Sequence, residues 1–116
     1  LSDMNTSSGQ RQARLAMDYI QKNYMDPDLS LNSICSYLNI STSYFSTIFK
    51  EMTGETFTEV LIRTRMEKAR ELLENTTMKK EEIAEKVGFS DPHYFGISFK
   101  KMTGCTPTEY AREKRR

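Results

Sequence analysis

FKEMTGETFT, at residues 49–58, returns as FKKMTGCTPT at residues 99–108, so the two segments match at a constant offset of 50. A tyrosine–phenylalanine pair precedes each copy, at residues 44–45 and 94–95. Self-similarity of this kind is typical of a duplicated supersecondary unit. The shared positions are those that pack a helix, cap its end and begin the next helix. The sequence therefore predicts one small binding unit that is used twice.

Length and composition leave few classes open. The chain has 116 residues, 37% hydrophobic and 28% charged, which suits one compact domain or two subdomains that share a long element. Its apolar runs fall short of the roughly 18 residues of a membrane-spanning helix, and its polar start lacks the apolar segment of a secretory signal. We expect a cytoplasmic protein with no membrane partner. Cys35 and Cys105 have no Cys-x-x-Cys motif or histidine cluster near them, so neither a disulfide nor a metal site is expected.

The net charge is lower than expected for a domain that binds nucleic acid mainly through its phosphates. The formal charge is +1, from 17 Lys and Arg against 16 Asp and Glu, whereas domains that bind nucleic acid mainly through its phosphates are strongly basic. The charges are unevenly distributed, however. Acidic residues gather between positions 67 and 85, and basic residues at Lys100, Lys101 and in the tail from Arg112. One face can therefore still be positive.

Apolar residues recur at three- and four-residue spacing almost throughout, and glycine and proline are few, so the predicted fold is all-α. Residues 1–9 are small and polar, and we expect them to be the remnant of a linker. A first helix is predicted from about Gln10 to Tyr24, before the breaker at residues 26–28. Its apolar stripe comprises Leu15, Ala16, Tyr19, Ile20 and Tyr24.

Two shorter helices joined by a sharp turn are expected next. Ser30 is a suitable N-cap for the first of them, and Ser41 for a second that ends at Gly54. Asn39 stands at the bend, where asparagine is tolerated because it can adopt left-handed backbone. Two helices separated by about three or four residues have the geometry of a helix-turn-helix. Residues 10–55 are therefore expected to form a first helix-turn-helix subdomain.

The second copy aligns with one extra residue in its turn. Gly88 stands where Asn39 stands in the first copy, at an offset of 49, and the offset is 50 in the helix that follows. Because glycine and asparagine adopt a positive φ most readily, both turns are predicted to use one. Asp91 and Pro92 supply an N-cap and a first-turn proline. Residues 76–116 are expected to form a second helix-turn-helix subdomain.

A long helix is predicted between the copies, from Phe57 to about Glu74, within the linking segment at residues 56–75. Thr56 and Glu59 have the spacing of a capping box at its start, and Thr106 and Glu109 repeat that spacing after the second copy. The predicted rod has about 18 residues and is roughly 27 Å long. Successive major-groove faces on one side of B-DNA lie about 34 Å apart, so such a rod can carry two reading units one turn apart.

The second copy also carries a recognisable set of motifs. They resemble the AraC/XylS family of bacterial transcription regulators, over about Leu15 to Arg112, and comprise Gly88-Phe89-Ser90, Tyr94-Phe95, Phe99-Lys100-Lys101, Gly104 and Thr106-Pro107. The resemblance implies a seven-helix DNA-binding domain, with two helix-turn-helix subdomains joined by a central helix. The resemblance also implies that each subdomain inserts its recognition helix into one of two adjacent major grooves of promoter DNA. In many members this output domain follows a ligand- or phosphorylation-sensing domain. The resemblance therefore implies two partners besides DNA, an upstream sensing domain and RNA polymerase. It implies no cofactor.

Candidate base-reading residues in the first copy follow from helix geometry. The apolar stripe turns Phe45 and Phe49 inward, which leaves Ser43, Ser46 and Thr47 on the opposite face. These positions match the family's readers. Short hydroxyls accept or donate hydrogen bonds, so each discriminates bases weakly.

The corresponding positions in the second copy are Pro92, His93, Gly96 and Ile97. Family members often carry arginine or another long polar residue near position 97, and this chain departs from that. His93 can bond a base or a phosphate, Ile97 can touch a thymine methyl, and Gly96 allows close approach of the backbone. We hypothesise that the second unit mainly positions the protein through phosphates while the first carries more of the sequence specificity.

Candidate phosphate contacts are basic residues near these faces. Lys50, Lys100 and Lys101 lie late in the expected recognition helices. Arg63 and Arg65 lie on the linking helix, and Arg63 matches a family arginine. Phosphate contacts fix the register of a protein on DNA without reading its sequence.

The repeated aromatic residues are expected to form core rather than base-stacking platforms. These aromatic residues are the two Tyr-Phe pairs and the later phenylalanines, namely Tyr44, Phe45, Phe49, Tyr94, Phe95 and Phe99. Met52 and Met102 are expected to fill the core beside them. An enzyme is not expected, since the one histidine leaves no catalytic triad. The alternative function is a helical protein–protein adaptor, which the near-neutral charge favours.

Overall fold

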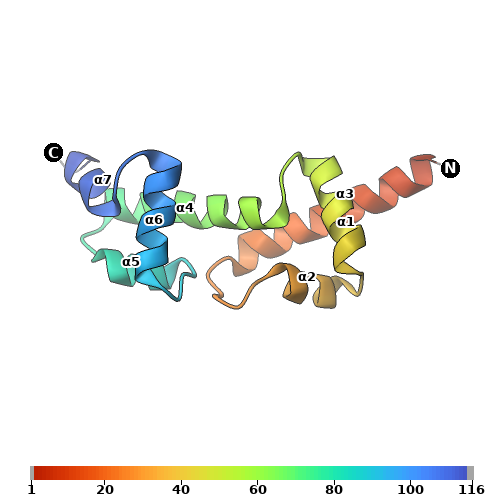
Figure 1. Ribbon diagram of the computed structural model, residues 1–116, viewed down its shortest axis with the longest axis horizontal. Coiled ribbons are helices and arrows are strands. Elements are labelled where there is room, and N and C mark those ends of the chain that lie inside the picture. The colour runs from red at the N-terminus through yellow and green to blue at the C-terminus, as the bar shows by residue number, and fades with distance from the viewer. Residues whose placement is uncertain (1, 115–116) are drawn as a thin grey trace. The chain divides into compact units, whose positions relative to one another are not determined.

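The computed structural model describes residues 2–114, with side chains from Ser8 onward. Within this range the chain forms seven α-helices and no strand, which confirms the all-α prediction (Figure 1). The helices are α1 (Ser2–Asn23), α2 (Leu31–Leu38), α3 (Thr42–Thr53), α4 (Phe57–Asn75), α5 (Lys80–Lys86), α6 (Pro92–Thr103) and α7 (Pro107–Lys114).

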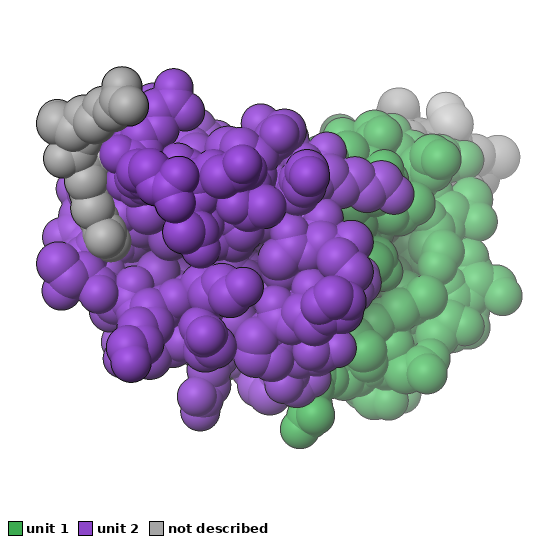
Figure 2. Space-filling model, turned by 60° about the vertical axis from the view of Figure 1, so that its left-hand side comes forward, with its two compact units in different colours: residues 1–24, 28–64 green, residues 25–27, 65–116 purple. Residues whose placement is uncertain are grey.

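These helices belong to two compact units (Figure 2). The first unit contains α1, α2, α3 and the part of α4 up to Thr64. The second contains the rest of α4 from Arg65, together with α5, α6 and α7, and also the short segment Met25–Pro27. The predicted linking helix is thus shared between the units rather than standing between them.

Helix α1 begins at Ser2 and not at the expected Gln10, so the stretch expected to be a linker is helical. Periodicity could not reveal this because the added residues are nearly all small and polar. Gly9 is buried against α3: a Cβ built on it would lie 3.1 Å from Ile48 Cγ2. Ala13 and Ala16 continue this face of small residues and are 5% and 0% exposed. Leu15, which we expected on the buried stripe, is 40% exposed.

Each unit has its own aromatic core. In the first, Phe45 lies 5.3 Å from Phe49 and 5.9 Å from Phe57, between ring centroids. In the second, Phe99 lies 5.9 Å from Phe95 and 5.5 Å from Tyr110. The repeated phenylalanines therefore pack their helices against the start of the helix that follows each copy.

The expectation that the repeated tyrosines belong to this core is wrong. Tyr44 is 44% exposed and Tyr94 is 49% exposed, and Met102 is 47% exposed whereas Met52 packs against the core of its unit. Successive helical residues differ by about 100° in direction, so a helix that buries a phenylalanine turns the preceding residue away from the core. A tyrosine there also keeps its hydroxyl in water.

The two sharp turns use positive φ, as predicted. Asn39 has φ 59° and Gly88 has φ 107°. In both turns the next residue closes the helix with its N–H: Ile40 donates to the Cys35 carbonyl at 3.1 Å, and Phe89 donates to the Ala84 carbonyl at 2.8 Å. The same hydrogen bond thus ends α2 and α5.

This geometry predicts the effect of exchanges at Asn39. Glycine there should leave the free energy of unfolding nearly unchanged, because it adopts positive φ without a steric penalty. Valine should lower it by about 1 to 2 kcal/mol, since its branched Cβ meets the backbone in that region. Urea denaturation measures the difference, and equal stability of the two variants would show that the turn tolerates another conformation.

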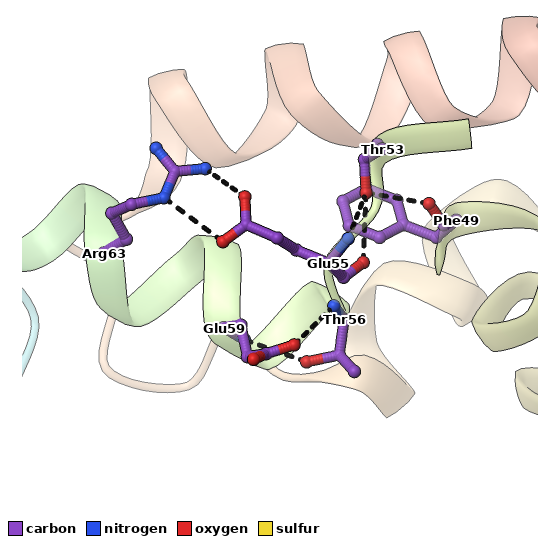
Figure 3. A network of polar contacts seen from close by, with 6 residues as sticks. All are labelled: Phe49, Thr53, Glu55, Thr56, Glu59 and Arg63. Carbon is purple, nitrogen blue, oxygen red and sulfur yellow. Dashed lines mark hydrogen bonds and ion pairs between the residues drawn. The ribbon is translucent and has the colours of Figure 1, made fainter. Parts of the chain in front are cut away.

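Both predicted capping boxes are present, with equal distances in the two copies. Thr56 N–H donates to Glu59 Oε1 at 2.8 Å and Glu59 N–H donates to Thr56 Oγ1 at 3.1 Å (Figure 3). Thr106 and Glu109 make the same two bonds at 2.8 and 3.1 Å. The bonds from the threonine backbone hold the pKa of both glutamates below the ordinary value of 4.5.

A pH dependence follows from these caps. A carboxyl whose pKa is lowered by folding stabilises the fold above its unfolded pKa, and that contribution is lost as the pH falls through the lowered folded pKa. Replacing Glu59 and Glu109 by glutamine should therefore flatten the dependence of the melting temperature on pH below about 4.5. The same exchange at Glu51, an exposed glutamate outside both boxes, should leave it unchanged. A wild-type slope that persists in the double variant would contradict this role.

A threonine holds each turn between the repeated helix and the next one. Thr53 Oγ1 lies 2.8 Å from the Phe49 carbonyl and 3.0 Å from the Glu55 carbonyl, and it accepts from Glu55 N–H (Figure 3). Thr103 makes the equivalent contacts around Cys105. The residue after each threonine, Gly54 or Gly104, has a positive φ. Each Thr-Gly pair therefore directs the following helix in the same way.

Candidate nucleic-acid interface

Helix α3 presents one polar face to solvent. Ser41 caps its start by accepting from Tyr44 N–H at 3.2 Å, and Gly54 ends it with φ 83°. The predicted readers Ser43, Ser46 and Thr47 are all exposed, as is Lys50. They lie at three- and four-residue spacing and therefore share one side of the helix.

The hydroxyl of Thr47 is partly committed to its own helix. Thr47 Oγ1 donates to the Ser43 carbonyl at 3.1 Å. Its proton is then unavailable to a base, so the side chain offers an acceptor oxygen and a methyl group. Ser43 and Ser46 are the hydroxyls on this face that can take either role.

Helix α6 presents a different surface at the matching positions. Asp91 caps it by accepting from His93 N–H at 3.0 Å, and Pro92 occupies its first turn. Pro92, His93 and Ile97 are exposed, and Gly96 is half-buried. A hollow of about 220 Å³ lies at this face. Its lining residues are Lys80, Pro92, His93, Gly96, Ile97, Lys100, Thr106 and Pro107.

The starts of α5 and α7 complete this hollow, and α7 is held in place by a polar cluster on α4. The Tyr110 hydroxyl donates to Glu74 Oε2 at 2.8 Å and accepts from Arg70 Nε at 3.3 Å. Lys114 Nζ lies 5.7 Å from the Tyr110 ring centroid. The hydrogen bond to Tyr110 raises the pKa of Arg70, so the Arg70 guanidinium stays positively charged. Periodicity alone could not identify this cluster because its members lie far apart in the chain.

The predicted phosphate contacts divide into exposed lysines and engaged arginines. Lys50, Lys100 and Lys101 are exposed in the last turns of α3 and α6. Arg63 pairs with Glu55, with Nη2 at 2.7 Å from Oε1 and Nε at 3.4 Å from Oε2 (Figure 3). Both side chains are about two-fifths exposed. The two parallel bonds fix the plane of the guanidinium beside the start of α4.

Arg65 has a structural place that the sequence did not predict. It is 7% exposed, its Nη2 donates to the Asp26 carbonyl at 2.8 Å, and its guanidinium lies 5.5 Å from the Phe89 ring centroid. Burial lowers the pKa of Arg65. The expected phosphate contact does not fit this position, since a buried guanidinium is not presented to a backbone phosphate. Arg65 is therefore a structural residue of the second unit.

A family model described as a helix-turn-helix domain matches residues 34–113, which include both turns and α4. The chain belongs to the AraC/XylS family. This AraC-type chain is a DNA-binding output domain, as the motifs implied, and its family is a class of transcription regulators rather than of enzymes. The adaptor alternative is therefore set aside.

Relatives and solved structures agree with this assignment. The raffinose operon transcriptional regulatory protein RafR of Pediococcus pentosaceus is 33% identical over 101 residues, which are 87% of this chain and 36% of that relative. The C-terminal domain of AraT, a response regulator from Geobacillus stearothermophilus, is 43% identical with a TM-score of 0.86, over 88% of this chain and 84% of that one.

A second solved structure is similar to the same degree. The C-terminal domain of the two-component response regulator yesN from Fusobacterium nucleatum is 40% identical with a TM-score of 0.83, over 84% of this AraC-type chain and 95% of that one. The chain spans about a third of the length of RafR. Among the described helices, none combines the length and the apolar character needed to cross a bilayer.

Proposed function

We propose that α3 and α6 are the recognition helices of this domain and that they enter adjacent major grooves of double-stranded promoter DNA. One observation carries the proposal: at an offset of 50 residues, the two helices turn the same positions away from the core, and the last of these positions is an exposed lysine in both. On α3 the face is Ser43, Ser46, Thr47 and Lys50, and on α6 it is His93, Gly96, Ile97 and Lys100. The 19 residues of α4 support adjacent grooves, because a helix of that length extends roughly 28 Å.

Basic residues at the edges of the two faces support this docking. Lys50, Lys100 and Lys101 supply flexible cations, and Arg63 a guanidinium oriented by Glu55. A net charge of +1 is sufficient if these cations line the DNA side, since counterion release depends on local contacts rather than on the total charge.

A gel-shift assay at two salt concentrations tests the proposal. DNA fragments are first selected from a random pool with this chain, and the affinity for the selected site is then measured at about 50 and 200 mM salt. We expect the affinity to fall steeply between the two concentrations, because each phosphate contact releases bound counterions. A chain that selects no sequence, or whose affinity does not respond to salt, would overturn the proposal.

We expect α3 to contribute more to the DNA sequence specificity than α6. Ser46→Ala or Thr47→Ala should change the selected DNA sequence more than His93→Ala, because α3 offers polar groups that can read base edges. Selection of binding sites by each variant, compared position by position with wild type, measures the change. The reverse ranking would show that α6 carries most of the specificity.

We further propose that this output domain works under the control of an upstream sensing domain. The chain spans 36% of RafR, and two of the solved neighbours are the C-terminal domains of response regulators. A protein that acts on promoters works beside the chromosome in the bacterial cytoplasm, with RNA polymerase as a partner. Pull-down of RNA polymerase by a promoter-bound complex, compared with the promoter alone, tests the last point.

A further inference from the structure

The reading face of α6 offers fewer hydrogen-bonding side chains than that of α3. At the matched positions, Ser46 of α3 is replaced by Gly96 and Thr47 by Ile97. Ile97 is 54% exposed, so its aliphatic side chain is accessible from solvent. Neither Gly96 nor Ile97 can recognise the donor and acceptor pattern of a base with its side chain. If these two residues read DNA, they read it by shape and apolar contact.

Gly96 is not required by the packing of the protein. A Cβ built at this position meets no heavy atom within 4 Å, so space is open in front of the helix. A helix with glycine in its interior is less stable than the same helix with alanine there. Gly96 lies in no turn and has no positive φ that would require glycine. The presence of glycine at position 96 is therefore better explained by binding than by folding: it lets a ligand approach the helix backbone closely.

The hollow in front of Gly96 is lined by both apolar and cationic residues. Pro92, Ile97 and Pro107 supply the apolar lining, whereas Lys80 and Lys100 bring positive charge to the same hollow. All these residues belong to the second unit. An apolar site flanked by cations fits a ligand that carries a small apolar group beside negative charges. In the major groove of DNA, the C5-methyl group of a pyrimidine has this setting.

We propose that the hollow reads the C5-methyl group of thymine, in contact with Ile97 and the exposed backbone at Gly96, while Lys80 and Lys100 bind flanking phosphates. This inference rests on the proposed function, since it requires α6 to lie in the major groove. It adds Lys80 to the contact set and makes the methyl group, rather than a hydrogen-bond pattern, the feature that α6 detects. Because 5-methylcytosine carries its methyl group at the same position of the ring, α6 is also sensitive to cytosine methylation.

Base analogues test the inference without changing the protein. In the selected site, each thymine is replaced in turn by deoxyuridine, which removes only the methyl group. We expect one position, or two neighbouring ones, at which the wild-type affinity falls about fourfold, the value of one buried methyl group. At that position a 5-methylcytosine·guanine pair should bind about fourfold more tightly than cytosine·guanine. If uracil is tolerated at every position, the inference is overturned.

Variants then show whether α6 is the reader. Ile97→Ala should bind the thymine and uracil probes equally, whereas the matched exchange Thr47→Ala on α3 should preserve the discrimination. Gly96→Leu should fill the hollow and weaken binding to both probes, with a melting temperature no lower than that of wild type, because leucine is the better helix former. Discrimination that survives Ile97→Ala would place the methyl contact elsewhere and overturn the inference. Failure of the proposed function itself looks different, since wild type would then select no DNA sequence.

Discussion

Alanine in place of Phe49 is expected to lower the free energy of unfolding of the first unit by about 3 to 5 kcal/mol. Phe49 is 0% exposed, and its ring centroid lies 5.3 Å from that of Phe45 and 6.0 Å from that of Phe57. The exchange removes burial from all three rings and leaves a cavity where α3 meets the start of α4. Since small domains are stable by only about 5 to 15 kcal/mol, this loss is a large fraction of the total.

The neighbouring tyrosine provides the control for this exchange. Tyr44 lies on the same helix and is 44% exposed, so Tyr44→Ala should cost less than about 1 kcal/mol. Denaturation by urea, followed by circular dichroism, measures both variants. Phe99→Ala makes the corresponding change in the second unit, where Phe99 contacts Phe95 and Tyr110. If the Tyr44 and Phe49 variants lost equal stability, the assignment of core and surface on α3 would be wrong.

Glutamine in place of both Lys100 and Lys101 is expected to weaken DNA binding about a hundredfold, because each charged contact to phosphate contributes about tenfold. The slope of log affinity against log salt should also decrease by about 1.8, which is the effect of two lost phosphate contacts. Titration of labelled DNA at several salt concentrations measures both quantities.

A matched exchange separates local contacts from total charge. Lys22 and Lys86 are exposed lysines on α1 and α5, outside α3 and α6. Replacing both by glutamine removes the same two charges and should leave the salt slope close to that of wild type. If both double variants weakened binding equally, the attraction would be a property of the whole chain and not of the end of α6.

The features that the sequence predicted correctly are those set by neighbouring residues. Both capping boxes and both positive-φ turns depend on side chains within a few positions of each other, such as Thr56 with Glu59, and they form as expected. The exposed faces of α3 and α6 follow from the inward phenylalanines by helix geometry alone. The start of α1 was not predictable, because its contact with α3 relies on the absent side chain of Gly9.

Features that depend on distant parts of the chain were missed. Arg65 lies close in sequence to Arg63, yet a carbonyl 39 residues away and the Phe89 ring make it a buried residue. The hollow at Gly96 is formed by the starts of three helices, which no spacing in the sequence brings together. The exposed face of a helix can therefore be predicted from sequence, whereas the shape of the surface around it requires the tertiary structure.

The segment Met25–Pro27 belongs to the second unit although residues of the first unit flank it on both sides. The chain therefore passes between the units three times, and no single cleavage can release the second as an intact piece. A fragment that starts at Arg65 loses the Asp26 carbonyl that its guanidinium bonds in the whole chain. The duplication that is visible in the sequence has thus produced two units that no single break in the chain can separate.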